Sequence, residues 1–242
     1  MLGKSCLIVI KEGSIVKKIV VFVGVDKSES STLHYIREVL KEVNKKVEID
    51  VSYYTQKSLK LELCKGCCQC FYTHKCNLDQ IDHMDLLKKE MLEADFVILG
   101  SPVYLHNVSG SMKNFIDRLS YWSHIFALRG KNGMVVSSAD SNGGRLVVDY
   151  LERVMAFFGC PVVASANIFS VYNYDDGLIE EHAEKIVDSL KCPIKSNKII
   201  DAIYITLKKI MECRAEREND VEYQYWKKNH FFDVGSFETL IK

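Results

Sequence analysis

The chain has 242 residues, of which 48% are hydrophobic and 26% charged, and its acidic and basic residues balance to a formal net charge of zero. This composition is ordinary for a globular protein and gives no reason to expect a nucleic-acid partner. No apolar run approaches the ~20 residues of a membrane helix, and the first residues do not resemble a signal peptide, so we expect a cytoplasmic protein with no membrane contact.

Strand-like apolar runs alternate with helical periodicity along most of the chain. We expect strands at 17–24, 45–53, 94–102, 132–138 and 160–166. Between them apolar residues recur at helical spacing, as at Met112, Phe115 and Ile116. Alternating strands and helices predict an α/β fold with a parallel sheet. Five strands fit a flavodoxin-like three-layer sandwich with the strand order 2-1-3-4-5.

The pattern changes near residue 196. We expect residues 1–195 to form one domain and residues 196–242 to form a C-terminal helical and aromatic extension. The apolar residues of its first part share one helical face: Ile199, Ile203, Leu207, Ile210 and Met211. The aromatic-rich stretch EYQYWKKNHFF follows. We expect this extension to contact a second subunit, or to cover a ligand, in a homodimer or homotetramer.

The loops after the first and third predicted strands should face each other, because ligands bind where the strand order of such a sheet reverses. The first loop reads GVDKSESST, from Gly24 to Thr32. It precedes a helix, whose N-terminus offers free N–H groups and a positive dipole end to a phosphate. The candidate phosphate contacts are Lys27, Ser30, Ser31 and Thr32. The alternative is that the serine and threonine residues simply cap the helix.

The second loop lies in GSPVYLHNVSGSMKNFIDR, residues 100–118. Here Tyr104 is placed to lie against a flat ring, and His106 and Asn107 offer polar contacts. A third loop, SSADSNGG at 137–144, carries paired glycines that allow a close approach of the backbone to a ligand.

The segment CKGCCQCFYTHKC holds five of the nine cysteines. Cys64, Cys67, Cys70 and Cys76 are spaced as C-x2-C-x2-C-x5-C, and Cys68 is extra. Such a run can hold a [4Fe–4S] cluster, because each thiolate reaches a different iron from a short loop. Redox-active thiols, a zinc site and disulfides remain alternatives.

The stretch from Asp95 to Arg118 resembles the NAD(P)H-dependent FMN reductases of flavodoxin-like fold, and also the related iron–sulfur flavoproteins. It carries S-P-x-Y and, further on, K-x-F-x-D-R. The likeness extends over about residues 18–190. The resemblance implies FMN as the cofactor and NAD(P)H as the donor. Where the family usually has G-S-P-R, this chain has Gly24-Val25-Asp26-Lys27, which replaces Arg with Lys and adds a carboxylate.

The resemblance also assigns roles to positions of this chain. It places the FMN phosphate at Lys27, Ser30, Ser31 and Thr32. It surrounds the isoalloxazine with Ser101, Pro102, Val103, Tyr104, His106 and Asn107. The third loop would approach the ring or the ribityl chain through Ser137, Ala139, Gly143 and Gly144. The [4Fe–4S] motif of the iron–sulfur flavoproteins matches Cys64, Cys67, Cys70 and Cys76.

We therefore predict an enzyme, an FMN-dependent oxidoreductase that passes electrons or hydride from NAD(P)H to a small or peptide acceptor. Quinones, flavins and activated alkenes such as dehydroamino acids are the acceptor classes considered. Tyr104 and His106 are the candidate catalytic residues, with His106 as a proton donor. The alternative function is an electron-transfer module that receives electrons from a ferredoxin through a [4Fe–4S] cluster. A non-catalytic flavin or redox sensor is the third class.

Overall fold

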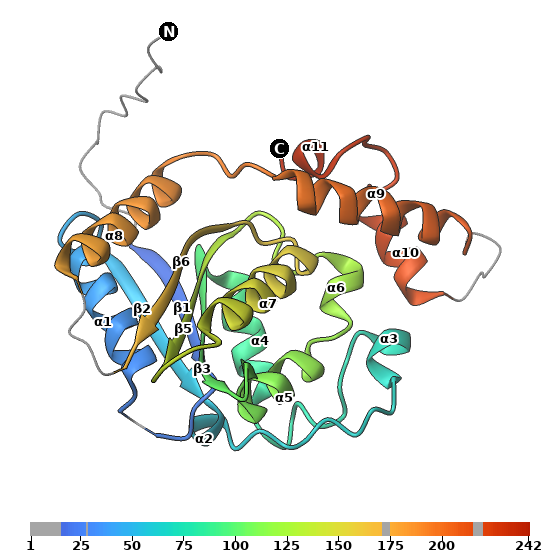
Figure 1. The fold of residues 1–242 in the computed structure, drawn as a ribbon. Coiled ribbons are helices and arrows are strands. Elements are labelled where there is room, and N and C mark those ends of the chain that lie inside the picture. Colours follow the sequence, from blue (N-terminus) through green and yellow to red (C-terminus); the bar gives the residue numbers. More distant parts are fainter. Residues whose placement is uncertain (1–15, 28, 171–174, 215–219) are drawn as a thin grey trace, which may run out of the picture.

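The computed structural model describes residues 16–27, 29–170, 175–214 and 220–242 (Figure 1). The N-terminal residues that were considered for a signal peptide lie outside this described part. The view in Figure 1 shows a central sheet flanked by helices, with the C-terminal helices gathered at one end.

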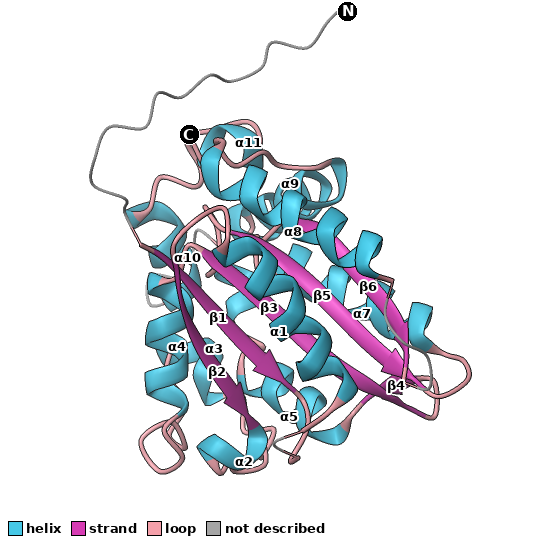
Figure 2. Cartoon of the chain, turned by 90° about the vertical axis from the view of Figure 1, so that its left-hand side faces the viewer, coloured by secondary structure: helices cyan, strands magenta, loops and turns pink. Residues whose placement is uncertain are grey.

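The centre of the fold is a parallel sheet in the order β2-β1-β3-β5-β6, as Figure 2 shows. Its strands are β1 (Lys17–Val23), β2 (Ile49–Thr55), β3 (Phe96–Tyr104), β5 (Asn132–Ala139) and β6 (Val162–Phe169). Numbered 1 to 5 along the chain, these five strands have the predicted order 2-1-3-4-5, and their ends differ from the predicted ones by a few residues. A short strand that was not predicted, β4 (Asn107–Val108), pairs antiparallel with β3.

Helices cover both faces of the sheet, so the predicted three-layer sandwich is confirmed. The continuous apolar run of β1 serves both layers, because successive side chains of a strand point to opposite faces. Val21 packs under α1 (Ser31–Asn44) and α8 (Asp176–Lys191). Phe22 packs under the opposite layer, α4 (Met84–Glu93), α5 (Gly110–Arg118) and α7 (Gly144–Phe157).

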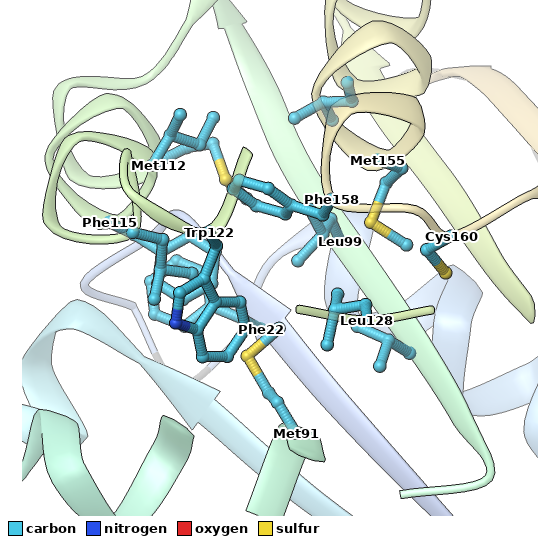
Figure 3. Close-up of a cluster of buried hydrophobic side chains, with 14 of the residues drawn as sticks. Phe22, Met91, Leu99, Met112, Phe115, Trp122, Leu128, Met155, Phe158 and Cys160 are labelled. Carbon is cyan, nitrogen blue, oxygen red and sulfur yellow. The ribbon is translucent and has the colours of Figure 1, made fainter. Parts of the chain in front are cut away.

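The second of these layers fixes the position of α5. Phe22 stacks on Phe115 with ring centroids 3.9 Å apart. Met91, Met112 and Trp122 close around this pair (Figure 3). Trp122 begins the short helix α6 (Trp122–Ile125). The tight packing holds α5 against the sheet, and both ends of this helix matter for the sites described below.

The C-terminal extension forms α9 (Lys198–Glu212), α10 (Val221–Lys228) and α11 (Phe237–Leu240). Several of its aromatic side chains pack around Phe126, with Trp226, Phe231 and Phe237 each 0% exposed. The indole of Trp226 also donates from Nε1 to the His124 carbonyl at 2.7 Å. The extension therefore packs on its own chain.

The predicted apolar face of α9 is partly wrong. Ile200 and Tyr204 are buried, whereas Ile199 is 62% exposed and Ile210 is 44% exposed. The reason is an aromatic contact, since Tyr204 stacks on Trp226 with centroids 5.8 Å apart. This ring, absent from an aliphatic pattern, decides which face of α9 turns inward.

A long connection between β2 and α4 contains the short helices α2 (Gln56–Leu59) and α3 (Gln69–Thr73), and it carries the cysteine segment, residues 64–76. Among the helices that the structure describes, none combines the length and the apolar character needed to cross a bilayer.

A buried tyrosine–histidine pair joins α1 to α8 and predicts a pH dependence of stability. Tyr35 Oη lies 2.8 Å from His182 Nδ1, and His182 is only 3% exposed. Burial lowers the pKa of His182 below its ordinary value. Because the unfolded chain then binds a proton that the folded chain does not, we expect the free energy of unfolding to fall as the pH drops below about 6.5.

Urea unfolding at several pH values measures this dependence. The matched variant Tyr35→Phe/His182→Leu removes both partners, so it leaves neither group buried without the other. We expect the double variant to lose less stability on acidification than the unchanged chain. Equal losses would show that His182 does not cause the effect.

Candidate functional site

A cavity of about 760 Å³ opens at the carboxyl ends of β1, β3 and β5. We call it the sheet-end cavity. Sheets of this strand order bind their ligands at this place. The lining comes from the β1–α1 loop, the end of β3, the start of α5 and the ends of β5 and β6. Its residues are Gly24, Val25, Asp26, Lys27, Glu29, Ser30, Ser31, His34, Pro102, Tyr104, Ser109, Gly110, Ser111, Ser138, Asp140 and Ser170.

The first loop brings a cation and two hydroxyl residues to this cavity. Lys27, Ser30 and Ser31 all line it, at the N-terminus of α1. Ser30 also caps that helix, because its Oγ accepts a hydrogen bond from the Leu33 N–H at 3.1 Å. The capping and the ligand-binding interpretations of Ser30 are therefore compatible.

Thr32 has a different environment from its neighbours. It is fully buried, and its Oγ1 lies 2.6 Å from Ser138 Oγ. This hydrogen bond ties the start of α1 to the end of β5. Three carboxylates also line the cavity, on Asp26, Glu29 and Asp140. An anionic ligand therefore meets both attraction and repulsion here.

The second loop is a hairpin formed by β3 and β4. Leu105 and His106 occupy its corner, with φ of +47° and +62°, as in a type I′ turn. Tyr104 is 62% exposed and lines the cavity. His106 Nε2 lies 2.9 Å from Asn142 Oδ1. Neither His106 nor Asn107 is among the described lining residues, so the hairpin presents Tyr104 to the cavity and His106 to the neighbouring loop.

The start of α5 is a part of the cavity wall that the sequence did not predict. Ser109 caps this helix, with Oγ accepting from the Met112 N–H at 3.1 Å and donating to the Gly24 carbonyl. The predicted Ser101 is fully buried, and its Oγ accepts from the Ser109 N–H at 3.0 Å. The S-G-S sequence before an apolar helix was the available capping signal.

The third loop contributes Ser138 and Asp140 to the described lining. The residues predicted from this loop are their neighbours: Ser137, Ala139, Gly143 and Gly144. A Cβ on Gly144 would lie 1.7 Å from Asn167 Oδ1, and one on Gly143 would lie 2.9 Å from His106 Cδ2. Both glycines are thus required by contacts within the protein, and any contact with a ligand stays a prediction.

A second cavity, of about 250 Å³, lies between the cysteine segment and the end of α5. We call it the cysteine cavity. The predicted ligands and the extra cysteine all line it: Cys64, Cys67, Cys68, Cys70 and Cys76. Gly66 and Cys68 have φ of +61° and +56°, which turns the backbone sharply within the segment. Every cysteine in the described part of the chain is a free thiol.

Neighbouring thiols affect the pKa of Cys70, but the described cysteines are not arranged as a complete coordination site for a metal ion. Burial raises the pKa of Cys70, and the charges of Cys76 and Cys64 raise it further. In the described residues, no group of three or more histidine, cysteine or carboxylate side chains is placed to hold a metal ion. Five of the residues that line the cavity are nonetheless cysteines, and thiolates are the ligands of a [4Fe–4S] cluster. This donor set suits a cluster, whose presence stays a prediction.

Helix α5 connects the two cavities. Gly110 and Ser111 at its start line the sheet-end cavity, and its last residues line the cysteine cavity. Nine residues rise about 13 Å. Asn114 also fixes the start of the cysteine segment, because its Oδ1 accepts from the Cys64 N–H at 2.9 Å and its Nδ2 donates to the Glu62 carbonyl at 3.1 Å.

The C-terminal extension contacts the cysteine segment from another side. His74 packs against Tyr225 of α10 with ring centroids 5.4 Å apart. Phe71 packs against His124 at 5.0 Å, and His124 Nδ1 lies 2.7 Å from Glu222 Oε1. No residue from the described part of the C-terminal extension lines the sheet-end cavity. A role as a lid would thus require a second subunit, and it stays a prediction.

Known proteins resemble this chain in sequence and in fold. Residues 17–173 match the family described as NADPH-dependent FMN reductase. An iron–sulfur flavoprotein of Archaeoglobus fulgidus is 35% identical over 156 residues, which cover 64% of this chain and 69% of the relative. An iron–sulfur flavoprotein of Methanocaldococcus jannaschii is 35% identical over 142 residues, which cover 58% and 71%.

A solved structure of NADH:FMN oxidoreductase in its apo form superposes with a TM-score of 0.57 at 18% identity, over 76% of this chain and 94% of that one. A structure of a flavone reductase superposes with a TM-score of 0.55 at 14% identity, over 72% and 62%. At these identities the likeness concerns the fold alone.

Proposed function

Because this chain belongs to the NADPH-dependent FMN reductase family, we propose that it binds FMN in the sheet-end cavity and reduces an acceptor with electrons from NAD(P)H. The position of that cavity carries the proposal. It lies at the ends of β1 and β3, where the strand order reverses, and the N-terminus of α1 contributes to its lining.

The first loop would bind the phosphate of FMN. Ser30 and Ser31 stand at the N-terminus of a 14-residue helix, whose N–H groups and dipole favour an anion. Lys27 is the only lysine or arginine in the described lining. Thr32 would contribute indirectly, because its hydrogen bond to Ser138 fixes the start of α1.

Bound FMN supplies the hydride and single-electron chemistry, and the hairpin residues orient the reacting partners. Tyr104 is exposed toward the cavity and would lie against the flat ring. His106, which lies beside the described lining and faces Asn142, would hold the proton that the acceptor takes up. Asn142 fixes the orientation of that imidazole through the contact with Nε2 at 2.9 Å.

Tyr104 lines the sheet-end cavity and is 62% exposed, so a small or peptide acceptor would reach a bound ring from this side. We propose quinones, flavins and activated alkenes as the acceptor classes, and a homo-oligomer in which a second subunit covers the cavity. The free thiols of the described chain suit a reducing compartment, so we place the protein in the cytoplasm.

The cysteine cavity supports a second candidate, an electron-transfer module with ferredoxin as the donor. Five thiols gather on one 250 Å³ cavity, and relatives of this chain carry the name iron–sulfur flavoprotein. A bound [4Fe–4S] cluster supplies single-electron transfer. Cys64, Cys67, Cys70 and Cys76 would hold it, at the far end of the helix whose start lines the sheet-end cavity.

Protein purified without oxygen decides between the candidates. FMN with steady NAD(P)H oxidation in the presence of an added acceptor supports the first function. About four irons per chain, together with activity that requires reduced ferredoxin, supports the second. Protein that neither retains FMN nor binds it on addition would contradict both.

Asp26 and Lys27 carry opposite charges in the lining of the sheet-end cavity, so replacing them should change the affinity for FMN in opposite directions. We expect Lys27→Ala to raise the dissociation constant for FMN about tenfold, or about 1.4 kcal/mol, because it removes the cation beside the phosphate. We expect Asp26→Asn to lower it, because a carboxylate leaves the same lining. Fluorescence titration measures both constants.

Riboflavin, which lacks the phosphate, is the matched ligand for this comparison. Neither substitution should change its affinity by more than about twofold, since the affected contact is with the phosphate. Equal effects on FMN and riboflavin would place the phosphate elsewhere.

A further inference from the structure

The guanidinium of Arg118 is buried at the cysteine cavity, and one of its N–H groups has no acceptor in the described part of the chain. We propose that this group, Nε–H, donates a hydrogen bond to a sulfur atom of a [4Fe–4S] cluster held by the cysteine segment, and that it raises the reduction potential of the cluster. The inference rests on the cluster of the second candidate function.

The other donors of Arg118 are all engaged. A guanidinium has five N–H groups. Nη1 donates to the Glu62 carbonyl at 3.0 Å and to Asp82. Nη2 donates to Asp79 at 2.9 Å and to Asp82 at 3.2 Å. Buried donors almost always have a partner, so the remaining Nε–H calls for one from outside the described chain.

The same contacts hold Arg118 at the cavity wall. Its side chain is 0% exposed, and it is hydrogen-bonded to the carboxylates of Asp79 and Asp82 and to the Glu62 carbonyl. Asp79 Oδ2 also accepts a hydrogen bond, at 3.4 Å, from the N–H of Cys76, which is the last predicted ligand. Glu62 lies just before the first predicted ligand, Cys64. The guanidinium thus spans both ends of the cysteine segment as a rigid fork.

A donor in this position affects a cluster in a known direction. Hydrogen bonds to the sulfur atoms are among the factors that set the potential of an iron–sulfur cluster. The reduced state carries more negative charge, so a cationic N–H stabilises it more than the oxidised state. Loss of the donor should therefore shift the midpoint potential to more negative values.

Lys88 provides a matched control. Its Nζ binds Asp79 at 2.7 Å, in the same buried network, and it is 6% exposed. It is not among the described residues that line the cysteine cavity. Lys88→Met removes a charge and keeps Nε–H of Arg118, whereas Arg118→Lys keeps the charge and removes Nε–H.

The experiment uses the full chain, reconstituted with iron and sulfide without oxygen, and follows the midpoint potential by EPR. We expect a larger negative shift for Arg118→Lys than for Lys88→Met, with unchanged iron content in both. A larger shift for Lys88→Met, or no shift for Arg118→Lys, would overturn the hydrogen bond and leave only a charge effect. If the unchanged chain binds no iron, the second candidate function fails along with the inference.

A second measurement needs no substitution at Arg118. In the unchanged chain labelled with ¹⁵Nε-arginine, pulsed EPR of the reduced cluster should show coupling to a ¹⁵N nucleus. Arg118 is the only arginine in the described lining of the cysteine cavity. An iron-loaded protein without this coupling would overturn the proposal even if Arg118→Lys fails to fold.

Discussion

Replacing Cys67 with alanine should lower the iron content of anaerobically reconstituted protein from about four atoms per chain to fewer than about one. Cys67 is an exposed thiol in the middle of the cysteine segment, and it lines the cysteine cavity. A cluster that loses one of its thiolate ligands is open to solvent on that iron and is readily lost. Because the side chain is exposed, the substitution should leave the unfolding free energy of the apoprotein within about 0.5 kcal/mol.

Cys68 is the matched control for that experiment. It is the next residue, it is also exposed, and it lines the same cavity. The C-x2-C-x2-C-x5-C spacing does not include it, so we expect Cys68→Ala to keep its iron. Iron retained by Cys67→Ala and lost by Cys68→Ala would reassign the ligands. Zinc in place of iron in the unchanged chain would reject a cluster for this site.

The parallel sheet was predictable because its central strands, β1, β3 and β5, are largely buried on both faces. A run such as that of β1 contains apolar side chains for two layers, and this signal is strong even without partners. The hairpin of β3 and β4 was missed for a local reason. Its corner is Leu105–His106, and type I′ turns usually carry Asn or Gly at such positions.

The direction of individual side chains was not predictable from loop composition. Ser31 and Thr32 are adjacent hydroxyl residues in one predicted phosphate loop. One lines the sheet-end cavity and the other is buried against Ser138. The turn of α1 decides this, because successive helical residues point about 100° apart. A loop motif therefore predicts where a site lies better than which hydroxyl reaches it.

The support of the cysteine segment could not be predicted at all. Arg118 meets Asp82 and Asp79 across sequence separations of 36 and 39 residues. Nothing in the local pattern of α5 indicates that its last residue faces a distant loop. Only the packing of α5 against the cysteine segment brings these ion-pair partners together.

The sheet-end cavity has a glycine whose substitution should have a large effect. A Cβ on Gly24 would lie 2.5 Å from Met112 Cβ and 2.8 Å from its backbone nitrogen. Neither atom can move without shifting the start of α5 away from β1. We expect Gly24→Ala to lower the free energy of unfolding by about 2–3 kcal/mol, the usual cost of overpacking. Urea unfolding of the apoprotein measures this loss.

Gly110 separates this steric effect from a general sensitivity of the cavity to substitution. It lines the same cavity, but a Cβ there would meet no heavy atom within 4 Å. At the first position of α5, alanine should be neutral or stabilising by up to about 1 kcal/mol. FMN titration completes the comparison: Gly24→Ala should weaken binding at least about tenfold, because Ser109 and the helix start would move with Met112. If the two variants were equally stable and bound FMN equally well, the contact of β1 with α5 would not shape the site.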